Sequence, residues 1–190
     1  MSYQETLDRL SADAEAKAQK VLDQLEAGDI DQAAAIALLV AIILVAQKRG
    51  AAVAELSFAA QVSALSKAPA VATGVAVGAP DIVHRVVTKT ITTSKGIDET
   101  RTRIARIAQN EPQEVAKQTY GKAMARSEKV EGWTRGLDSD PCELCVWWSR
   151  DGRVWPKDYP LAHHKGCQCT QVPVLAHRVA EVPYSRILKR

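Results

Sequence analysis

The first part of the chain carries hydrophobic residues at the spacing of amphipathic helices. Between residues 7 and 25, leucine, alanine and valine recur at steps of three and four, after a stretch at 2–5 (SYQE) that has the form of a capping box. Gly28 ends this pattern. A second helical pattern begins at 29–32 (DIDQ) and runs to Gly50, which stands in the position of a C-cap. The pattern predicts two antiparallel helices joined by a short turn.

The second of these helices contains an uncharged run at 33–46. This run is shorter than the roughly 20 residues that a membrane-spanning helix needs, which argues against a membrane span. A helix that is apolar on every side is usually buried, either within its own bundle or against identical subunits. We therefore expect a homo-oligomer. A membrane-active role is the alternative, and it would need the alanine-rich segment that follows.

The pattern weakens after residue 50. Residues 51–67 have apolar positions close to helical spacing and predict a third helix that stops at Pro69. Residues 69–96 begin with small, uncharged residues and read as a flexible linker, whose second half, 83–96, is rich in β-branched residues and predicts a strand or an irregular connection. His84 has no histidine or acid at a useful spacing, so we assign it a structural or solvent-facing place.

Helical sequence resumes at Ile97 and continues to Asn110. Pro112 fits the first turn of a further helix that reaches about Lys129. Arginines and lysines recur along these helices and are diluted by glutamates. This face is either simply solvated or a surface for phosphate or an acidic partner.

Composition supports a helical protein. Of the 190 residues, 46% are hydrophobic but only 5% are aromatic, which favours helices over a β-sandwich. The net charge of +3 permits contact with nucleic acid without requiring it. The first ten residues are polar and carry acids, so we expect no signal peptide.

The candidate chemistry is concentrated near the C-terminus. All four cysteines lie in a C-x-x-C at 142–145 and an H-H-x-x-C-x-C at 163–169. These two half-sites have the spacing of a zinc ribbon or knuckle, and this interpretation is preferred to disulfides or a redox dithiol because no export signal accompanies them. Asp151-Gly152 is a turn signal that predicts a β-hairpin between WWSR and RVWP.

The sequence lacks the common catalytic motifs. The chain has no G-x-S-x-G, no H-E-x-x-H and no phosphate-binding glycine loop. A surplus of thiol ligands would fill a zinc shell and leave no position for substrate, so we expect no enzyme. The tryptophans Trp147, Trp148 and Trp155 are interpreted as core and cover of the zinc module, with stacking on nucleic-acid bases as the alternative.

Residues 100–176 carry a longer ordered pattern. A helix ending in AMARSEK is followed by an acidic turn, C-x-x-C, D-G-x-x-x-P and H-x-x-C-x-C-x-x-x-P. The matching positions are Asp138, Cys142, Cys145, Asp151, Gly152, Pro156, His164, Cys167, Cys169 and Pro173. This order resembles the C-terminal domain of the phage Mu F-like minor head proteins, also called the head morphogenesis family. Two departures are Lys165, where the family commonly has proline, and the additional His163.

The resemblance implies a ligand set and a function. Alignment with H-x-x-C assigns the histidine ligand to His164, and the candidate metal ligands are Cys142, Cys145, His164, Cys167 and Cys169. These are five ligands for the four positions of a structural zinc, so one of Cys167 and Cys169 is left over, or four cysteines displace His164.

The implied protein is a virion component, a minor capsid protein of head morphogenesis in a tailed bacteriophage. It would associate with the portal protein and with the major capsid protein, inside the capsid or at the portal vertex, after assembly in the host cytoplasm. Contact with packaged DNA is a further implication. Two other functions stay open: a capsid maturation protease and a nucleic-acid-binding zinc module.

The predicted fold is mainly α (α+β). An N-terminal helical hairpin or bundle at 1–68 is followed by a flexible linker at 69–96. A Mu F-like domain at 97–176 has helices that lead into a small zinc-stabilised β-hairpin module at 138–174. A C-terminal tail at 177–190 completes the chain.

Overall fold

The computed structural model describes residues 2–72, 74, 79–138, 140–164 and 166–175. Its elements, in chain order, are α1 (Tyr3–Ala27), α2 (Gln32–Ser66), α3 (Pro80–Thr93), α4 (Ile97–Arg126), β1 (Val130–Gly136), α5 (Glu143–Ser149), the 3-10 turn η1 (Arg150–Gly152), β2 (Trp155–Pro156) and β3 (Thr170–Leu175). The fold is mainly α with a small antiparallel sheet, as the sequence predicted. The tail predicted at 177–190 lies outside the described residues.

The chain forms two compact units. Unit 1 consists of residues 1–53 and 76–116, and unit 2 of residues 54–75 and 117–190. α2 and α4 each contribute residues to both units.

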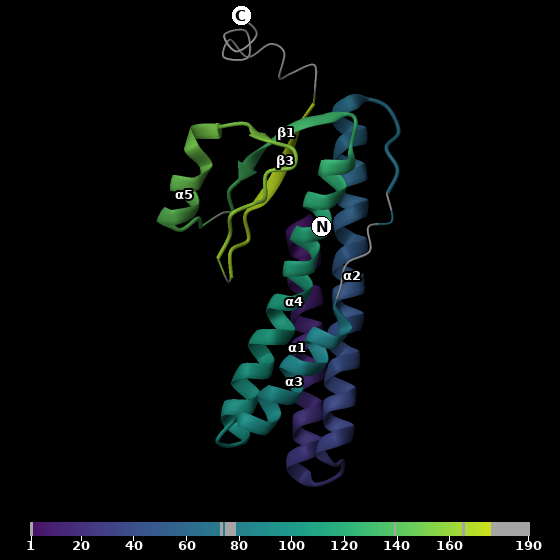
Figure 1. The fold of residues 1–190 in the computed structure, drawn as a ribbon, viewed down its shortest axis with the longest axis vertical. Helices are drawn as coiled ribbons and strands as arrows, with labels where there is room; N and C mark the ends of the chain where they lie inside the picture. Colours follow the sequence, from purple (N-terminus) through teal and green to yellow (C-terminus); the bar gives the residue numbers. More distant parts are fainter. Residues whose placement is uncertain (1, 73, 75–78, 139, 165, 176–190) are drawn as a thin grey trace, which may run out of the picture. The chain divides into compact units, whose positions relative to one another are not determined.

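The helical hairpin at the start of unit 1 is confirmed. The Ser2 hydroxyl accepts a hydrogen bond from the Glu5 amide, and the Glu5 carboxylate accepts one from the Ser2 amide, which completes the predicted capping box. Gly28 ends α1 in the left-handed region at φ 80°. The N-terminal cap of α2 is Asp31, whose carboxylate accepts from the Ala34 amide at 2.7 Å. In Figure 1, α1 and α2 run side by side in opposite directions.

The two separate helices predicted at 29–50 and 51–67 are one helix, α2. It continues without a break from Gln32 to Ser66, and Gly50 lies inside it instead of capping it. A Cβ atom at Gly50 would lie only 2.5 Å from the Pro112 carbonyl oxygen. Glycine is therefore present because the backbone of α4 approaches closely, and a glycine inside a helix is compatible with helical geometry.

The greater length of α2 also weakens the argument against a membrane span. Among the described residues, α2 is the one helix long and apolar enough to cross a bilayer by length and composition, with a mean hydropathy of 1.9 in its most apolar window. Of that window, 28% is buried inside the protein.

α3 corrects the prediction of a strand or irregular connection at 83–96. Pro80 stands in its first turn, and Val83, Val87 and Thr90 are buried at helical spacing. The hydroxyls of three threonines donate to backbone carbonyls four residues earlier: Thr90 to Val86, Thr92 to Thr88 and Thr93 to Lys89. These hydrogen bonds keep the threonines compatible with a helix despite their preference for strands. His84 is exposed, as expected.

α4 begins at Ile97 as predicted, but it does not restart at Pro112. That proline lies inside one continuous helix. A proline in a helix interior removes one backbone hydrogen bond and favours a kink, so sequence alone suggested a boundary. The buried residues on either side, Ile104 and Ala108 before Pro112 and Val115 and Ala116 after it, continue one helical face.

The core of unit 1 is built from small and branched apolar side chains. Its buried members are Ala14, Ala18, Val21, Leu22, Ala35, Leu39, Ile43, Ala46, Val83, Val87, Ile104 and Ala108. These residues come from α1, α2, α3 and α4, so each of the four helices contributes one face.

Unit 2 contains a three-stranded antiparallel sheet in the order β2-β1-β3. β1 is the central strand: Trp133 pairs with Trp155 of β2 and with Pro173 of β3. Trp133 is buried, and its indole N–H donates to the Tyr159 carbonyl at 3.0 Å. This strand follows α4 and ends just before Asp138.

The hairpin predicted around Asp151-Gly152 is wrong. The WWSR segment belongs to the helix α5 and to η1, and the short strand β2 pairs with β1. Arg150 and Asp151 both adopt positive φ at the end of α5, so the turn residues end a helix here. The tryptophans of this segment differ in burial, because Trp147 is 56% exposed while Trp148 packs against the cysteines.

Candidate metal centre

The first half-site is formed at the start of α5. Cys142 is the N-cap residue of this helix, and its carbonyl accepts from the Val146 amide at 3.0 Å. Cys145 follows three residues later and therefore lies on the same side of the first turn. Cys142 is exposed and Cys145 is buried. The first turn of α5 thus places both thiols on one side of the helix.

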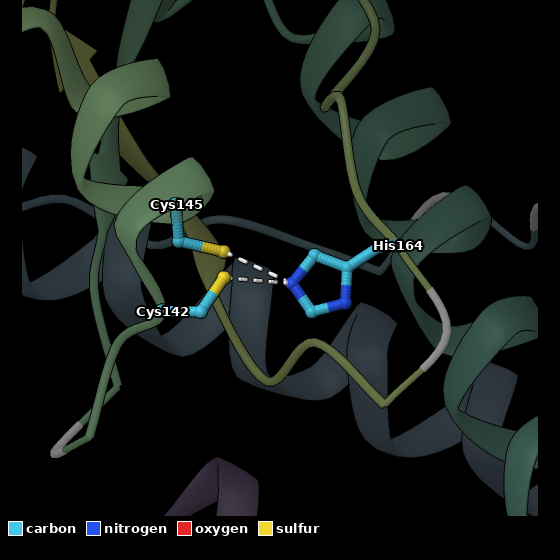
Figure 2. A group of neighbouring side chains, drawn as sticks. All are labelled: Cys142, Cys145 and His164. Atoms are coloured by element: carbon cyan, nitrogen blue, oxygen red, sulfur yellow. Dashed lines mark hydrogen bonds between the residues drawn. The ribbon is translucent and has the colours of Figure 1, made fainter.

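His164 meets these thiols from a separate loop. Its Nε2 atom lies 3.1 Å from the Cys142 sulfur and 3.5 Å from the Cys145 sulfur. Figure 2 shows both cysteine side chains pointing toward this one ring nitrogen. The imidazole ring also lies beside Trp148, with ring centroids 6.4 Å apart.

The last two cysteines lie before β3, and both are buried. The Cys167 sulfur is 3.5 Å from the Cys145 sulfur. The Cys169 thiol donates toward the Asp138 carboxylate, with the sulfur 3.7 Å from Oδ2. Cys167 is thus directed at the first half-site, while Cys169 has an acidic partner of its own.

Two of these three distances match a tetrahedral metal ion, and the third, 3.1 Å between the Cys142 sulfur and His164 Nε2, is shorter. With zinc–sulfur bonds of about 2.3 Å and zinc–nitrogen bonds of about 2.0 Å, neighbouring ligand atoms are separated by roughly 3.5 to 3.8 Å. The separations of Cys145 from His164 and from Cys167 are both 3.5 Å. Cys145 belongs to two groups of neighbouring ligand atoms. The first group adds Cys142 and His164, and the second adds Cys167 and Cys169. The arrangement is compatible with a metal site.

The surroundings shift the thiol pKa values in opposite directions. Burial raises the pKa of Cys145, and burial also raises that of Cys169. Hydrogen bonding from the Cys145 backbone lowers the pKa of Cys142. At Cys167, burial raises the pKa, but hydrogen bonds from Cys169 and Cys145 and the nearby charge of Lys117 outweigh it and the net shift is downward. Cys142 and Cys167 are therefore the thiols that ionise more readily.

Arg135 is a member of this site that the sequence did not reveal. Its side chain is buried, with Nη1 4.0 Å from the Cys145 sulfur and the guanidinium carbon 5.2 Å from the centre of the Trp148 ring. Nη2 donates to the Ala162 carbonyl. The alternation of β1 was the available signal, because Arg135 lies two residues after the buried Trp133 and on the same face.

His163 lies outside the cluster of cysteines and His164. His163 Nδ1 lies 2.9 Å from the Leu161 carbonyl oxygen, and its ring lines a hollow of about 340 Å³ with residues of α4 and the 157–161 loop. Of the two histidines, His164 is the one that lies close to Cys142 and Cys145, and its assignment as a ligand stays a prediction.

Comparison with known proteins gives one match that spans nearly the whole chain. Residues 1–186 match the family model described as VG15 protein. No curated protein and no solved structure was found to match the chain.

Proposed function

Because the chain belongs to the VG15 protein family, which indicates a phage protein, we propose that it is a structural minor head protein of a tailed phage. The observation that carries this proposal is the convergence of the C-x-x-C and H-x-x-C segments. These are the motifs through which the chain resembles Mu F-like minor head proteins, and their side chains come together from separate segments of unit 2.

The proposed metal is a structural zinc held by Cys142, Cys145, His164 and Cys167. Three thiolates and one imidazole complete a tetrahedral shell, and such a closed shell leaves no position for water or substrate. Cys167 is preferred to Cys169 because its sulfur lies 3.5 Å from the Cys145 sulfur. The Cys169 thiol donates to the Asp138 carboxylate instead, as suits a thiol that stays protonated beside the metal.

The ligand set is tested by metal analysis of protein purified without a chelator. We expect one zinc per chain in the wild type and loss of zinc in Cys142→Ser, Cys145→Ser, His164→Ala and Cys167→Ser. The chain offers matched controls, because Cys169→Ser and His163→Ala change the same residue types one or two positions away. Both controls should keep the zinc. A folded wild type without zinc would remove the metal from the proposal.

The module is proposed to stiffen a head protein that associates with the portal. It would act inside the capsid or at the portal vertex, with the major capsid protein and packaged DNA as neighbouring partners. Support comes from the resemblance to minor head proteins and from the cysteine and histidine side chains that lie close together in unit 2.

Portal association is tested by purifying the portal of the same phage from assembling heads. We expect this protein to be retained at a fixed ratio to the portal, and the zinc-free Cys145→Ser variant to be reduced. Heads that contain a complete portal but none of this protein would contradict the proposal, whatever the result of the zinc analysis.

A further inference from the structure

The exposed side of α2 carries an ordered stripe of residues within unit 1. Leu38 is 43% exposed and Val45 is 48% exposed, and Ala41 between them is also exposed. Further residues at steps of three and four extend this line from Asp31 to Lys48. The stripe consists of Asp31, Ala34, Leu38, Ala41, Val45 and Lys48.

This spacing is the repeat of a coiled-coil seam. Apolar residues separated alternately by four and three positions form the contact line between two packed helices. The opposite side of α2 is already used, because Ala35, Leu39 and Ile43 are buried in the core of unit 1. The stripe therefore lies on a different side of the same helix from the core residues.

The two ends of the stripe have opposite charges. Asp31 is exposed at the start of the helix and Lys48 is exposed near the end of the stripe. If two copies of α2 pack antiparallel, the first end of one stripe meets the last end of the other. The layers are then Asp31 opposite Lys48, Ala34 opposite Val45, and Leu38 opposite Ala41, each occurring twice by symmetry.

The side chains that face each other in this antiparallel arrangement also differ in size. Each large side chain faces an alanine of the other copy, so the helices can approach closely. A hollow of about 210 Å³ lies beside Ala41 and Val45, with Leu10 and Ala14 of α1 on its other side. A cavity of about 150 Å³ holds a benzene molecule, so this hollow has room for a leucine side chain from a second copy.

Charges around the hollow also have both signs. Asp13 on α1 contacts Lys17 at 2.6 Å and Arg49 at 3.9 Å, and all three side chains are about half exposed. A bilayer fits this face poorly, because Lys48 and Arg49 fall in the middle of α2, where charge in hydrocarbon is costly.

We propose that the Asp31–Lys48 stripe of α2 is an antiparallel, two-fold interface between two copies of this chain. The proposal stands on the pattern of α2 and does not depend on the zinc site or on portal association. The expected solution state is a dimer.

The first test measures the mass of the full-length protein in solution by light scattering. Wild type should be dimeric at tens of micromolar, and Leu38→Glu and Val45→Glu should be monomeric. Ile82→Glu is the matched control, because Ile82 is 50% exposed on α3, outside the stripe, and this variant should stay dimeric. Helical circular dichroism identifies any variant that fails to fold.

The second test asks whether Asp31 of one copy lies opposite Lys48 of the other. Asp31→Lys places lysine opposite Lys48 and should weaken dimerisation at least tenfold. Adding Lys48→Asp to the same variant restores an opposite-charge pair and should recover most of the affinity. Both proteins lack the Asp31 cap of α2, so the comparison between them reports the pairing alone.

Three results would overturn the proposal. The first is a monomeric wild type at tens of micromolar. The second is a dimer that Leu38→Glu and Val45→Glu leave intact. The third is a wild-type monomer that binds phosphatidylcholine–phosphatidylglycerol vesicles, or purified portal, through this stripe.

Discussion

At the residue scale, Arg135 places a buried positive charge against the cysteine cluster. A site of three thiolates, one imidazole and Zn²⁺ carries a net charge of −1, and burial makes such a charge costly without a partner. The guanidinium lies 4.0 Å from the Cys145 sulfur, so it can offset that charge directly. It also joins β1 to the 157–164 loop through the Ala162 carbonyl.

We expect Arg135→Met to weaken zinc binding about 10- to 100-fold, the usual effect of removing a group that supports metal ligands. Arg135→Lys keeps the charge and should recover part of the loss. Competition with a chromophoric chelator measures both affinities. An unchanged affinity in Arg135→Met would show that the guanidinium serves packing alone.

At the element scale, Gly50 sets how closely α2 and α4 approach in unit 1. We expect Gly50→Ala to destabilise the protein, because the new methyl group would meet the Pro112 carbonyl oxygen at 2.5 Å. Overpacking costs about 1–3 kcal/mol, which exceeds the roughly 1 kcal/mol that alanine gains over glycine in a helix.

The measurement is urea unfolding followed by circular dichroism. Gly96→Ala is the control, because a Cβ atom at Gly96 meets nothing within 4 Å. Gly96 is the N-cap residue of α4, so this change should cost a few tenths of a kcal/mol, less than the change at Gly50. A Gly50→Ala protein more stable than wild type would mean that helix propensity outweighs the contact.

Hydrophobic spacing predicted the helices where local signals agree with tertiary structure. The Ser2 cap, the Gly28 end and the start of α4 at Ile97 were all predicted from the sequence. Gly50 was predicted to end one helix and Pro112 to begin another, whereas both lie inside continuous helices that approach each other at these two residues. Contacts between segments distant in sequence are not encoded in a local pattern.

The same limit applied to α3 and to the metal centre. In α3 the β-branched residues suggested a strand, although Val83, Val87 and Thr90 already had helical spacing. The clustering of the cysteines with His164 was predicted from their spacing, because metal-ligand chemistry uses few residue types. The preference for Cys167 over Cys169, and the presence of Arg135, needed coordinates, since both depend on which side chains β1 and the loops bring together.

At the scale of the whole molecule, the side chains of the candidate metal centre all belong to unit 2. Both units bury apolar side chains among the described residues: unit 1 buries Leu22, Leu39 and Ile43, for example, and unit 2 buries Phe58, Met124 and Trp133. The cluster around the candidate metal centre contains three buried cysteines, with Trp148 packed against it. Apparent zinc-binding free energies of small modules are on the order of 10 kcal/mol, which is comparable with the entire stability of a domain. Metal removal should therefore affect unit 2 far more than unit 1.

This difference can be measured with the natural fluorophores. The four tryptophans, Trp133, Trp147, Trp148 and Trp155, all belong to unit 2, whereas α1 and α3 lie wholly in unit 1. We expect a chelator to shift tryptophan emission to longer wavelength while most helical circular dichroism remains. Hydrogen exchange should accelerate in β1, β3 and α5 and stay slow in α1. Added zinc should reverse both changes. Equal acceleration in α1 and β1 would instead mean that the two units unfold together, so that the metal centre stabilises the helices as well as its own module.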